Sequence, residues 1–400
     1  MRITKVDTII VRVPLGQQRF LSSQCAFPER NSLLVRVETD EGIHGWGEGG
    51  QYGPPEPVAS CINHVLVPLI TGKNPLDHGR ISLELYAATR DYGQKGPYIE
   101  ALSAIDIALW DIAGQALGVP VSRLLGGAFR DSVPSYATGC YYRGGNHLDH
   151  RSTLAGLAEE AKSYREAGFR MLKMKVGLLR VEDDWERVAA VREAIGPECT
   201  LLVDANHAYN AMTAVHMARG LERHNVRWFE EPVPPEDREG YRRVRNSTSV
   251  PIAGGECEYT RYGFRDLITG GCVDIAQPDL CVAGGFSEWQ RIVALADSFG
   301  VWTVPHVWGS GVALAAALHA LAALPPFPHT AHPVPMQNEP VIEFDRNYNP
   351  LRDDLLEDPI RCVGGSVAIP AGPGLGIRVR EDVLEHYANA APMAARGAEC

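Results

Sequence analysis

Three acidic residues recur at equal spacing in the middle of the chain. Asp204, Glu230 and Glu256 are 26 residues apart in both steps, and each follows a short apolar run. That interval is the length of one strand–helix unit, so we expect the carboxylates at the ends of successive strands, where barrel enzymes place their active sites. Carboxylates held together repel one another unless a cation neutralises them. Their hard oxygen atoms predict a Mg²⁺ site, the alternative being three unrelated acids that each cap a helix.

Two lysines lie on the strand expected before Asp204. Lys173 and Lys175 belong to the segment MLKMKV, and residues two apart on a strand share a face. Like charges held close lower each other's pKa, and a lysine with a lowered pKa can act as a base near neutral pH. The alternative is a pair of solvated surface lysines.

A second candidate acid/base group closes the sixth and seventh expected strands. Asp279 and His306 are 27 residues apart and therefore neighbours in a barrel. A carboxylate bonded to one imidazole nitrogen fixes the tautomer and raises the basicity of the other. The pair would face the lysines, although a single histidine near a proline is often only a packed structural residue. Glu343, at the end of the eighth strand, could protonate or hydrogen-bond a substrate carboxylate oxygen.

Together these groups suit removal of a proton α to a carboxylate. The enediolate that results is unstable, and a divalent metal with a base of matched pKa lowers the barrier to forming it. A barrel metallohydrolase is a weaker alternative, because the chain has no His-x-His motif and its candidate ligands are all carboxylates. A further alternative is a non-catalytic binding protein on the same fold. Failure of the protein to bind Mg²⁺ would favour that alternative.

The elements that position these residues predict a (β/α) barrel with an α+β capping domain. The capping domain is expected at 1–128, with a strand at 3–14, a hairpin at 32–46 and helices over 56–72, 77–89 and about 100–118. The barrel is expected at 129–345. Its eight strands are predicted at 133–139, 171–176, 201–206, 226–232, 251–256, 273–279, 301–307 and 340–344. The segment 346–400 should return to the capping domain, with its last ten residues disordered.

Composition narrows the possible partners. A net charge of −11 argues against nucleic acid or an anionic membrane, and no apolar run is long enough to span a bilayer. The nine cysteines are odd in number and form no CxxC pair, which predicts reduced thiols and a cytoplasmic protein. We expect a small carboxylate substrate and, as for most soluble enzymes of this kind, a symmetric homo-oligomer.

Short motifs around the candidate residues resemble those of the enolase superfamily, in its mandelate racemase subgroup. The resemblance runs over residues 1–385 and includes KMK with Lys173 and Lys175, DAN with Asp204 and Asn206, FEEP with Glu230, GGE with Glu256, QPD with Asp279 and PHVWG with His306. The resemblance implies that the three acids bind Mg²⁺ and that Glu343 is an electrophilic acid. It also implies two acid/base groups on opposite sides of the substrate. One is Lys175, whose pKa Lys173 tunes, and the other is the Asp279–His306 pair. We also expect Asn206 and Trp308 to contact substrate, and loops near 16–25 and 48–56 to close over it.

Within the subgroup the chain resembles the galactarolactone cycloisomerases. The matching stretches include RDYGQKG (90–96), VDANHAY (203–209), QPDLCVAGGFSE (277–288) and EFDRNYNP (343–350). This implies opening of a sugar-acid lactone by β-elimination to a 2-keto-3-deoxy acid. The chain departs from the pattern at 140–142 and 257–259, both expected at the barrel mouth. Dehydration of a sugar acid, and racemisation or epimerisation of a 2-hydroxy acid, stay open because pocket contacts decide among these outcomes.

Overall fold

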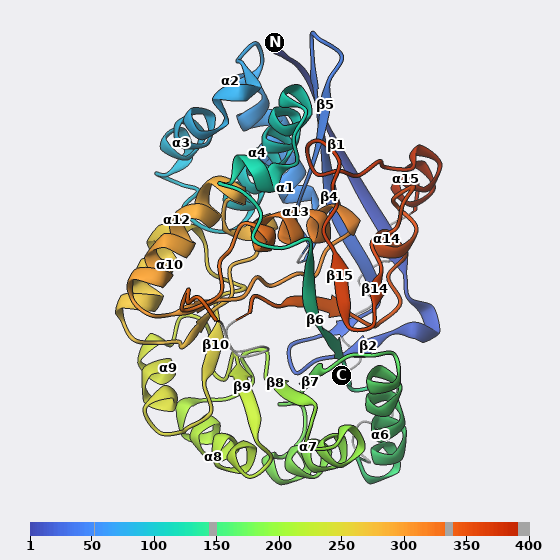
Figure 1. Ribbon diagram of the computed structural model, residues 1–400, viewed down its shortest axis with the longest axis vertical. Helices are drawn as coiled ribbons and strands as arrows, with labels where there is room; N and C mark the ends of the chain where they lie inside the picture. The colour runs from blue at the N-terminus through green and yellow to red at the C-terminus, as the bar shows by residue number, and fades with distance from the viewer. Residues whose placement is uncertain (52, 144–149, 333–338, 391–400) are drawn as a thin grey trace.

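A computed structural model of the chain describes residues 1–51, 53–143, 150–332 and 339–390 (Figure 1). Its first part is an antiparallel sheet in the order β1–β4–β5. These strands are β1 (Ile3–Pro14), β4 (Glu29–Thr39) and β5 (His44–Gly49). The strand predicted at 3–14 and the hairpin predicted at 32–46 are therefore confirmed.

Helices cover this sheet and share an apolar core with it. They are α1 (Glu56–Cys61), α2 (Val67–Ile70), α3 (His78–Thr89) and α4 (Pro97–Leu117). Helix α4 packs directly on β5, and it ends at Gly118, whose φ of 68° is left-handed. Gly47 of β5 makes this packing possible, because a Cβ there would lie 1.9 Å from the carbonyl oxygen of Ala104.

Eight parallel strands follow, each overlapping a segment that the sequence predicts. They are β6 (Ser132–Gly139), β7 (Met171–Lys175), β8 (Thr200–Asp204), β9 (Val226–Glu230), β10 (Ile252–Gly254), β11 (Ile275–Ala276), β12 (Trp302–Thr303) and β13 (Ile342–Asp345). Strands β6 to β12 pair in chain order, and β13 returns to pair with β6. One buried cluster, which includes Tyr136, Met171, Leu202 and Trp228, draws residues from the successive strands. This is the filled interior expected of a (β/α) barrel.

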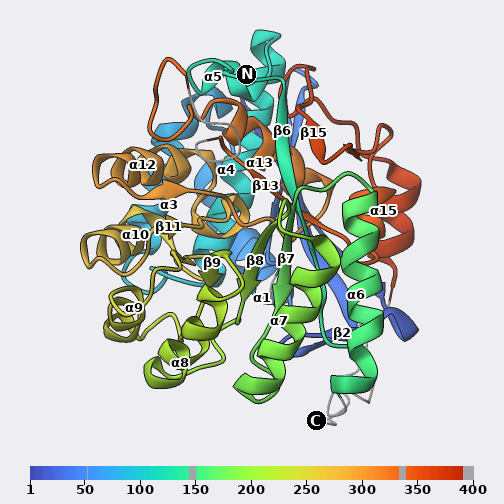
Figure 2. The same cartoon turned by 60° about the horizontal axis from the view of Figure 1, so that its bottom comes forward.

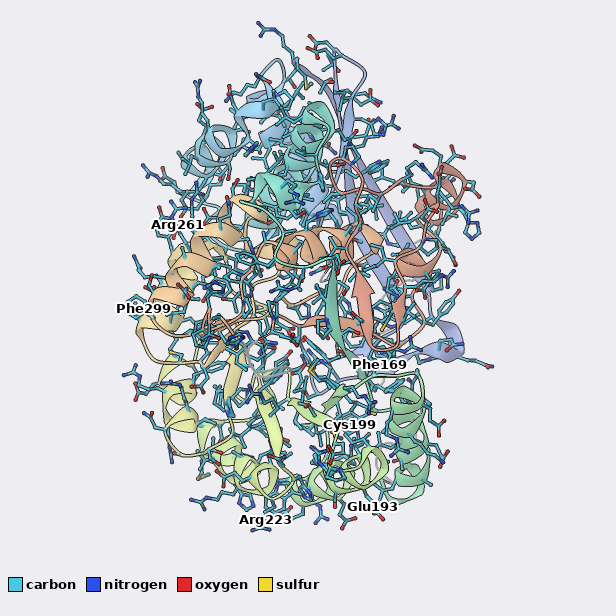
Figure 3. The ribbon with its side chains drawn as sticks, viewed as in Figure 1. Phe169, Glu193, Cys199, Arg223, Arg261 and Phe299 are labelled. Carbon is cyan, nitrogen blue, oxygen red and sulfur yellow. The ribbon has the colours of Figure 1, made fainter. Side chains whose placement is uncertain are left out.

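The helices between these strands lie outside them (Figures 1 and 2). They are α6 (His150–Glu166), α7 (Val181–Ile195), α8 (Ala211–Glu222), α9 (Arg238–Arg245), α10 (Thr260–Thr269), α11 (Leu280–Ala283), α12 (Gly285–Ser298) and α13 (Gly311–Ala322). Arg223 and Phe299 lie on the outer rim, whereas the buried Phe169 and Cys199 lie inward (Figure 3). After β13 the first helix is the short α14 (Pro350–Asp353), in place of a long eighth barrel helix.

The C-terminal segment touches both parts of the molecule. Strands β14 (Cys362–Val363) and β15 (Ser366–Ala368) form a hairpin, and β15 pairs antiparallel with β6. Helix α15 (Glu381–Ala388) packs against β1. The ten terminal residues predicted to be disordered lie outside the described residues, and the two domain boundaries, at 128/129 and 345/346, stay predictions.

A short hairpin of the first part lies against the barrel. It consists of β2 (Phe20–Leu21) and β3 (Ala26–Phe27). The backbone of Leu21 exchanges hydrogen bonds with that of Tyr142, and the Ser23 hydroxyl donates to the carbonyl oxygen of Ala205 at 2.6 Å. Both partners lie just after the C-terminal ends of barrel strands, so the hairpin covers the face where the sequence places the site.

A buried carboxylate fastens the first part to the barrel from another side. Glu48 of β5 accepts hydrogen bonds from the amides of Ser310 and Ala313 at 2.8 and 2.9 Å, and from the Ser310 hydroxyl at 2.6 Å. Ser310 is the N-cap of α13. Glu48 therefore occupies the N-terminal end of that helix, where a negative charge is favourable.

Among the described residues, no helix is both long and apolar enough to cross a membrane.

Candidate active site and metal centre

The three equally spaced acids meet at one point. Asp204 and Glu230 are the last residues of β8 and β9 and pair directly in the strand register, and Glu256 lies two residues after β10. All three are buried, and one oxygen atom from each lies within 4.8 Å of the others. The convergence predicted from their spacing is therefore what the fold produces.

Neighbouring donors orient these carboxylates. Glu230 Oε2 accepts from the Trp228 indole at 3.0 Å and from the Gln277 amide at 2.8 Å. Asp204 Oδ1 accepts from the backbone amide of Asn206 at 2.9 Å. One oxygen of Asp204 and one of Glu230 are thus held by these donors, and the other oxygen of each contacts a lysine of β7.

The donor set fits a hard divalent cation. Burial raises the pKa of Glu230 to about 7, a sign of how costly its negative charge is in this enclosure. Burial also disfavours the charged form of Asp204, but Lys175 and Lys173 outweigh it and lower the pKa to about 2. A bound cation would compensate the same charges, and three carboxylate oxygens are ligands that Mg²⁺ prefers.

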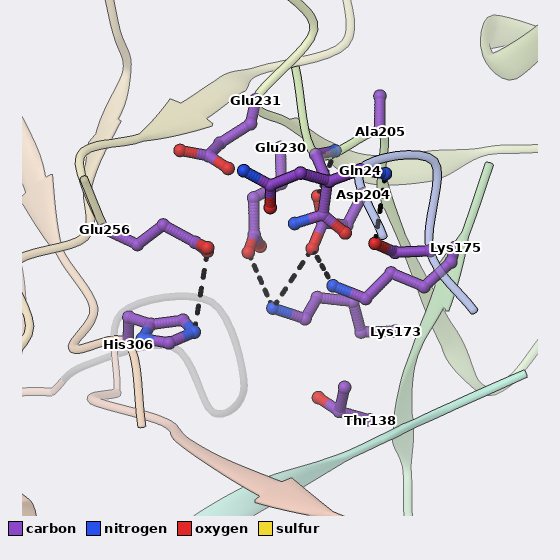
Figure 4. Close-up of polar contacts among 12 residues, drawn as sticks. Gln24, Thr138, Lys173, Lys175, Asp204, Ala205, Glu230, Glu231, Glu256 and His306 are labelled. Carbon is purple, nitrogen blue, oxygen red and sulfur yellow. Dashed lines mark hydrogen bonds and ion pairs between the residues drawn. The ribbon is translucent and has the colours of Figure 1, made fainter. Parts of the chain in front are cut away.

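The two lysines of β7 reach into this cluster from one side (Figure 4). Lys173 Nζ lies 2.6 Å from Glu230 Oε1 and 3.0 Å from Glu343 Oε1, while Lys175 Nζ donates to Asp204 Oδ2. Both side chains are buried, so the alternative of two solvated surface lysines is wrong.

The expected lowering of the Lys175 pKa is not found. Burial and the neighbouring Lys173 do lower this pKa, as the sequence argument supposed. The carboxylates of Asp204 and Glu256 and the nearby Tyr141 raise it by more, so the net shift is upward. Repulsion by Lys173 does not decide the direction of this shift, because Lys175 forms a direct ion pair with Asp204.

The expected histidine–aspartate pair is formed. His306 Nδ1 lies 2.7 Å from Asp279 Oδ2, and the other ring nitrogen points to Glu256 Oε2 at 3.5 Å and Glu343 Oε2 at 3.9 Å. Burial lowers the pKa of His306, but Glu256, the bond to Asp279 and Glu343 raise it to about 9. The ring is fixed by Asp279, with Nε2 turned toward the carboxylate cluster.

Glu343 lies within β13 (Ile342–Asp345) rather than at its end, and that strand pairs with β6. Its Oε1 accepts a hydrogen bond from the Thr138 hydroxyl at 2.6 Å. Burial raises the pKa of Glu343, but Lys173 and His306 outweigh it and lower the pKa overall. Glu343 is thus a hydrogen-bond acceptor in this state, and its expected role as an acid stays a prediction.

The two expected substrate contacts differ in their surroundings. Asn206 follows Asp204 with a left-handed φ of 41°, and its buried Oδ1 has no hydrogen-bond partner among the described residues. Trp308 packs with Phe20, Phe27 and Tyr141, and the Arg30 guanidinium lies 4.5 Å from its ring centroid. Asn206 therefore offers a free acceptor, whereas Trp308 forms part of an aromatic wall shared with the β2–β3 hairpin.

Two residues of this neighbourhood were missed by the sequence argument. Gln51, from the segment after β5, donates a hydrogen bond to Asp279 Oδ2. The Tyr141 ring centroid lies 5.2 Å from Lys175 Nζ. The loop expectation at 48–56 pointed to the right segment, but nothing in the spacing singled out Gln51, because it comes from outside the strand–helix repeat.

Known proteins resemble this chain over nearly its full length. It is 44% identical over 387 residues to the D-galactarolactone cycloisomerase of Agrobacterium fabrum, covering 97% of this chain and 99% of that protein. It is 34% identical over 355 residues to the arabinonate dehydratase of Saccharolobus solfataricus, covering 89% and 90%.

Solved structures agree with the sequence relatives. The 3,6-anhydro-D-galactonate cycloisomerase from Zobellia galactanivorans superposes with a TM-score of 0.85 at 40% identity, covering 97% of this chain and 99% of that one. A racemase from Streptomyces coelicolor A3(2) with bound magnesium superposes with a TM-score of 0.84 at 28% identity, covering 96% and 99%.

Two family profiles match the chain in succession. Residues 5–126 match the mandelate racemase / muconate lactonizing enzyme N-terminal domain, and residues 156–383 match the enolase C-terminal domain-like family. The first range contains the capping sheet, and the second contains β7 to β13 and the acidic centre. The chain belongs to the enolase superfamily, in the family of mandelate racemase and muconate lactonizing enzyme.

Proposed function

We propose that this protein removes the proton α to the carboxylate of a sugar acid lactone and opens the ring by β-elimination to a 2-keto-3-deoxy acid. The observation that carries the proposal is the position of Lys175 and His306, which lie on opposite sides of the carboxylate cluster (Figure 4). A substrate carbon between them has a proton-transfer group on each face. The 44% identity to a D-galactarolactone cycloisomerase supports a lactone as the substrate.

Asp204, Glu230 and Glu256 would hold Mg²⁺ in this reaction. Their converging, buried oxygen atoms support that assignment. When bound, the metal stabilises negative charge on the substrate carboxylate, so that the α-carbon becomes acidic enough to lose its proton.

The chain's own residues would handle the protons. Lys175 takes or gives a proton on one face of the substrate, and Lys173 helps to hold it in place through Asp204, which both lysines contact. His306 acts from the other face through Nε2, because Asp279 occupies Nδ1. In the elimination the α C–H bond breaks, its electrons form the new C=C bond, and the bond from the β-carbon to the ring oxygen breaks. The ring oxygen leaves as part of a carboxylate, and the enol that results loses its O–H proton and gains a proton at C3 to become the 2-keto product.

The same site supports a second candidate, dehydration of the open sugar acid. Relatives at 34% identity include arabinonate and D-galactonate dehydratases. In dehydration the leaving group is hydroxide, which must be protonated as it departs. A carboxylate leaving group has a conjugate-acid pKa near ~4 and needs no proton. Lactone opening therefore needs one proton-transfer group, whereas dehydration needs two. Racemisation or epimerisation would likewise need both.

This difference provides the test. Lys175→Ala and His306→Asn should each be assayed on a hexaric acid lactone and on the open diacid, with Lys162→Ala as a surface-lysine control. We expect one of the two variants to lose all activity, and the other to keep much of the lactone reaction while losing control over protonation at C3. Equal collapse on both substrates in both variants would contradict the cycloisomerase proposal and favour a dehydratase or epimerase.

We further infer a cytoplasmic homo-oligomer that acts on a small carboxylate. The eight described cysteines are all free thiols, which supports a reducing compartment. The oligomer rests on the general tendency of soluble enzymes to form symmetric assemblies, and light scattering of the purified protein would measure it.

A further inference from the structure

A second group of potential metal ligands lies beside the carboxylate centre. Glu231 and Cys257 directly follow Glu230 and Glu256, and His207 lies three residues after Asp204. The ligand atoms of His207, Glu231 and Cys257 all lie within 4.8 Å of one another. The three residues therefore come from the same three strand ends as the acidic centre but use different side chains.

The spacing of these atoms suits a small tetrahedral site. His207 Nε2 lies 3.2 Å from Glu231 Oε2 and 3.8 Å from Cys257 Sγ. Ligand atoms around a tetrahedral Zn²⁺ ion, with bonds of about 2.0–2.3 Å, are separated by roughly 3.3–3.6 Å. The observed separations lie close to that range, so small shifts of the side chains would complete the site.

Glu231 has an unused, buried acceptor in this group. Its side chain is only 1% exposed, and its Oε2 accepts no hydrogen bond from any described residue. The 3.2 Å contact to His207 Nε2 lacks the alignment of a hydrogen bond. In Figure 4 the Glu231 carboxylate lies on the side of the acidic centre away from Lys173. A buried carboxylate oxygen without a donor is costly, and a cation would satisfy it.

We propose that His207, Glu231 and Cys257 bind a borderline-soft divalent cation, with Zn²⁺ as the preferred ion, at a site separate from the Mg²⁺ ligands. A thiolate and an imidazole select Zn²⁺ or Co²⁺ over Mg²⁺, which prefers oxygen. Binding requires the Cys257 thiol to lose its proton to solvent, and water would supply a fourth ligand. The site does not depend on the proposed reaction, because it shares no ligand with the acidic centre.

Co²⁺ provides a direct optical test, because a cobalt–thiolate bond absorbs in the near ultraviolet by charge transfer. The protein is first saturated with Mg²⁺ and then titrated with Co²⁺. We expect one equivalent of Co²⁺ to bind with a charge-transfer band in the wild type. Cys257→Ser should lose the band, and Cys25→Ser, which removes an exposed thiol outside the group, should keep it. Zn²⁺ should displace the bound Co²⁺ and abolish the band.

A second variant covers the case in which Cys257→Ser does not fold, as judged by circular dichroism. His207→Gln leaves the thiol intact and should weaken Co²⁺ binding at least about tenfold. Absence of the band in the wild type, or an unchanged band in Cys257→Ser, would overturn the proposal. So would unchanged Co²⁺ affinity in His207→Gln. Failure of the sugar-acid assays would leave this optical result unaffected.

Discussion

Three carboxylates and two lysines share one buried space at the mouth of the barrel, and each depends on the others for its charge. Asp204, Glu230 and Glu256 are at most 6% exposed, and Lys173 bridges Asp204 and Glu230 at 3.8 and 2.6 Å. A buried charge without a partner is expensive. Removing one carboxylate takes away a metal ligand, and in the fold the smaller repulsion among the remaining acids offsets part of the ion pair that a lysine loses.

Alanine substitutions test the metal assignment. We expect Asp204→Ala, Glu230→Ala and Glu256→Ala each to abolish turnover while the circular dichroism spectrum stays native. The measurement is the rate at low Mg²⁺ concentration. A variant that keeps more than about a tenth of the wild-type rate has lost less than ~1.4 kcal/mol of transition-state stabilisation, and its residue is then not a ligand.

The two acid/base groups should be separable by isotope exchange. If Lys175 and His306 face opposite sides of one carbon, each variant should stop exchange of the α-proton on its own side with D₂O. Exchange on the other side can continue. Proton NMR of epimeric substrates incubated with Lys175→Ala and His306→Asn measures both. Should Lys175→Ala keep exchange on both sides with every substrate, the lysine is only structural.

Residue types and spacing predicted most of this site, for a physical reason. The strand–helix period of about 26 residues carries Asp204, Glu230 and Glu256 to neighbouring strand ends, so their convergence can be read from the sequence. The direction of the Lys175 pKa shift could not be predicted from the sequence, because it depends on distances of a few ångströms to Asp204 and Lys173. The role of Gln51 was not predicted for another reason, which is that its partner Asp279 is 228 residues away in the sequence.

At the scale of elements, the segment after β5 completes the histidine pair of the barrel. Asp279 Oδ2 accepts from both His306 and Gln51, and Oδ1 accepts from the amide of Cys281 at 2.7 Å. Hydrogen bonds to a charged group contribute about 1.5–3 kcal/mol each. Gln51 therefore helps to hold the Asp279 carboxylate in place and, through it, the His306 ring, and we assign it as a positioning residue.

Gln51→Leu should slow the steps that use His306 about tenfold or more, which corresponds to ~1.4 kcal/mol. Exchange of the proton on the Lys175 side should stay near the wild-type rate, because Gln51 does not touch that lysine among the described contacts. The two exchange rates of one variant thus serve as each other's control. Gln290→Leu, a substitution of an exposed glutamine on α12, should change neither. A loss on both sides would mean that Gln51 acts on the fold alone.

The elements themselves were predicted in kind but not in length. All eight barrel strands occur where expected, yet β11 and β12 have only two paired residues each, against seven expected for both. Apolar runs indicate where the chain is buried and extended, whereas strand length also depends on where each neighbour turns away. The β2–β3 hairpin was expected only as a loop, because its strands of two residues are too short for an alternating pattern to be recognised.

At the scale of the whole molecule, one buried histidine connects a barrel helix to the C-terminal segment. His319 of α13 is 0% exposed, and its Nε2 lies 3.0 Å from the carbonyl oxygen of Leu375 in the C-terminal segment. The amide of Ser122 faces its Nδ1 at 3.4 Å. Burial lowers the pKa of His319 from 6.5 to about 4. The imidazole is therefore neutral in the folded protein near pH 7, with Nε2–H donating and Nδ1 accepting.

This pKa predicts a loss of stability in mild acid. Below pH 6.5 the unfolded chain takes up a proton that the folded protein refuses, so the free energy of unfolding falls as the pH drops toward about 4. The loss attributable to His319 is at most about 3 kcal/mol. Urea denaturation at several pH values, for the wild type and His319→Gln, measures it. The gap between the two curves should change across this window and stay constant above pH 7, whereas parallel curves throughout would contradict the assignment.

The contact between Glu48 and α13 has a consequence for recombining parts of related enzymes. A chimera that keeps this barrel but takes its capping region from a relative must bring a carboxylate to the same place, or the Ser310 and Ala313 amides lose their acceptor. Gly309 adds a second requirement, because a Cβ there would lie 2.3 Å from Glu48 Oε1 and 2.7 Å from Gln51 Oε1. Substrate loops taken from a relative would therefore keep their position only when the donor and recipient proteins have compatible residues at positions 48, 51 and 309.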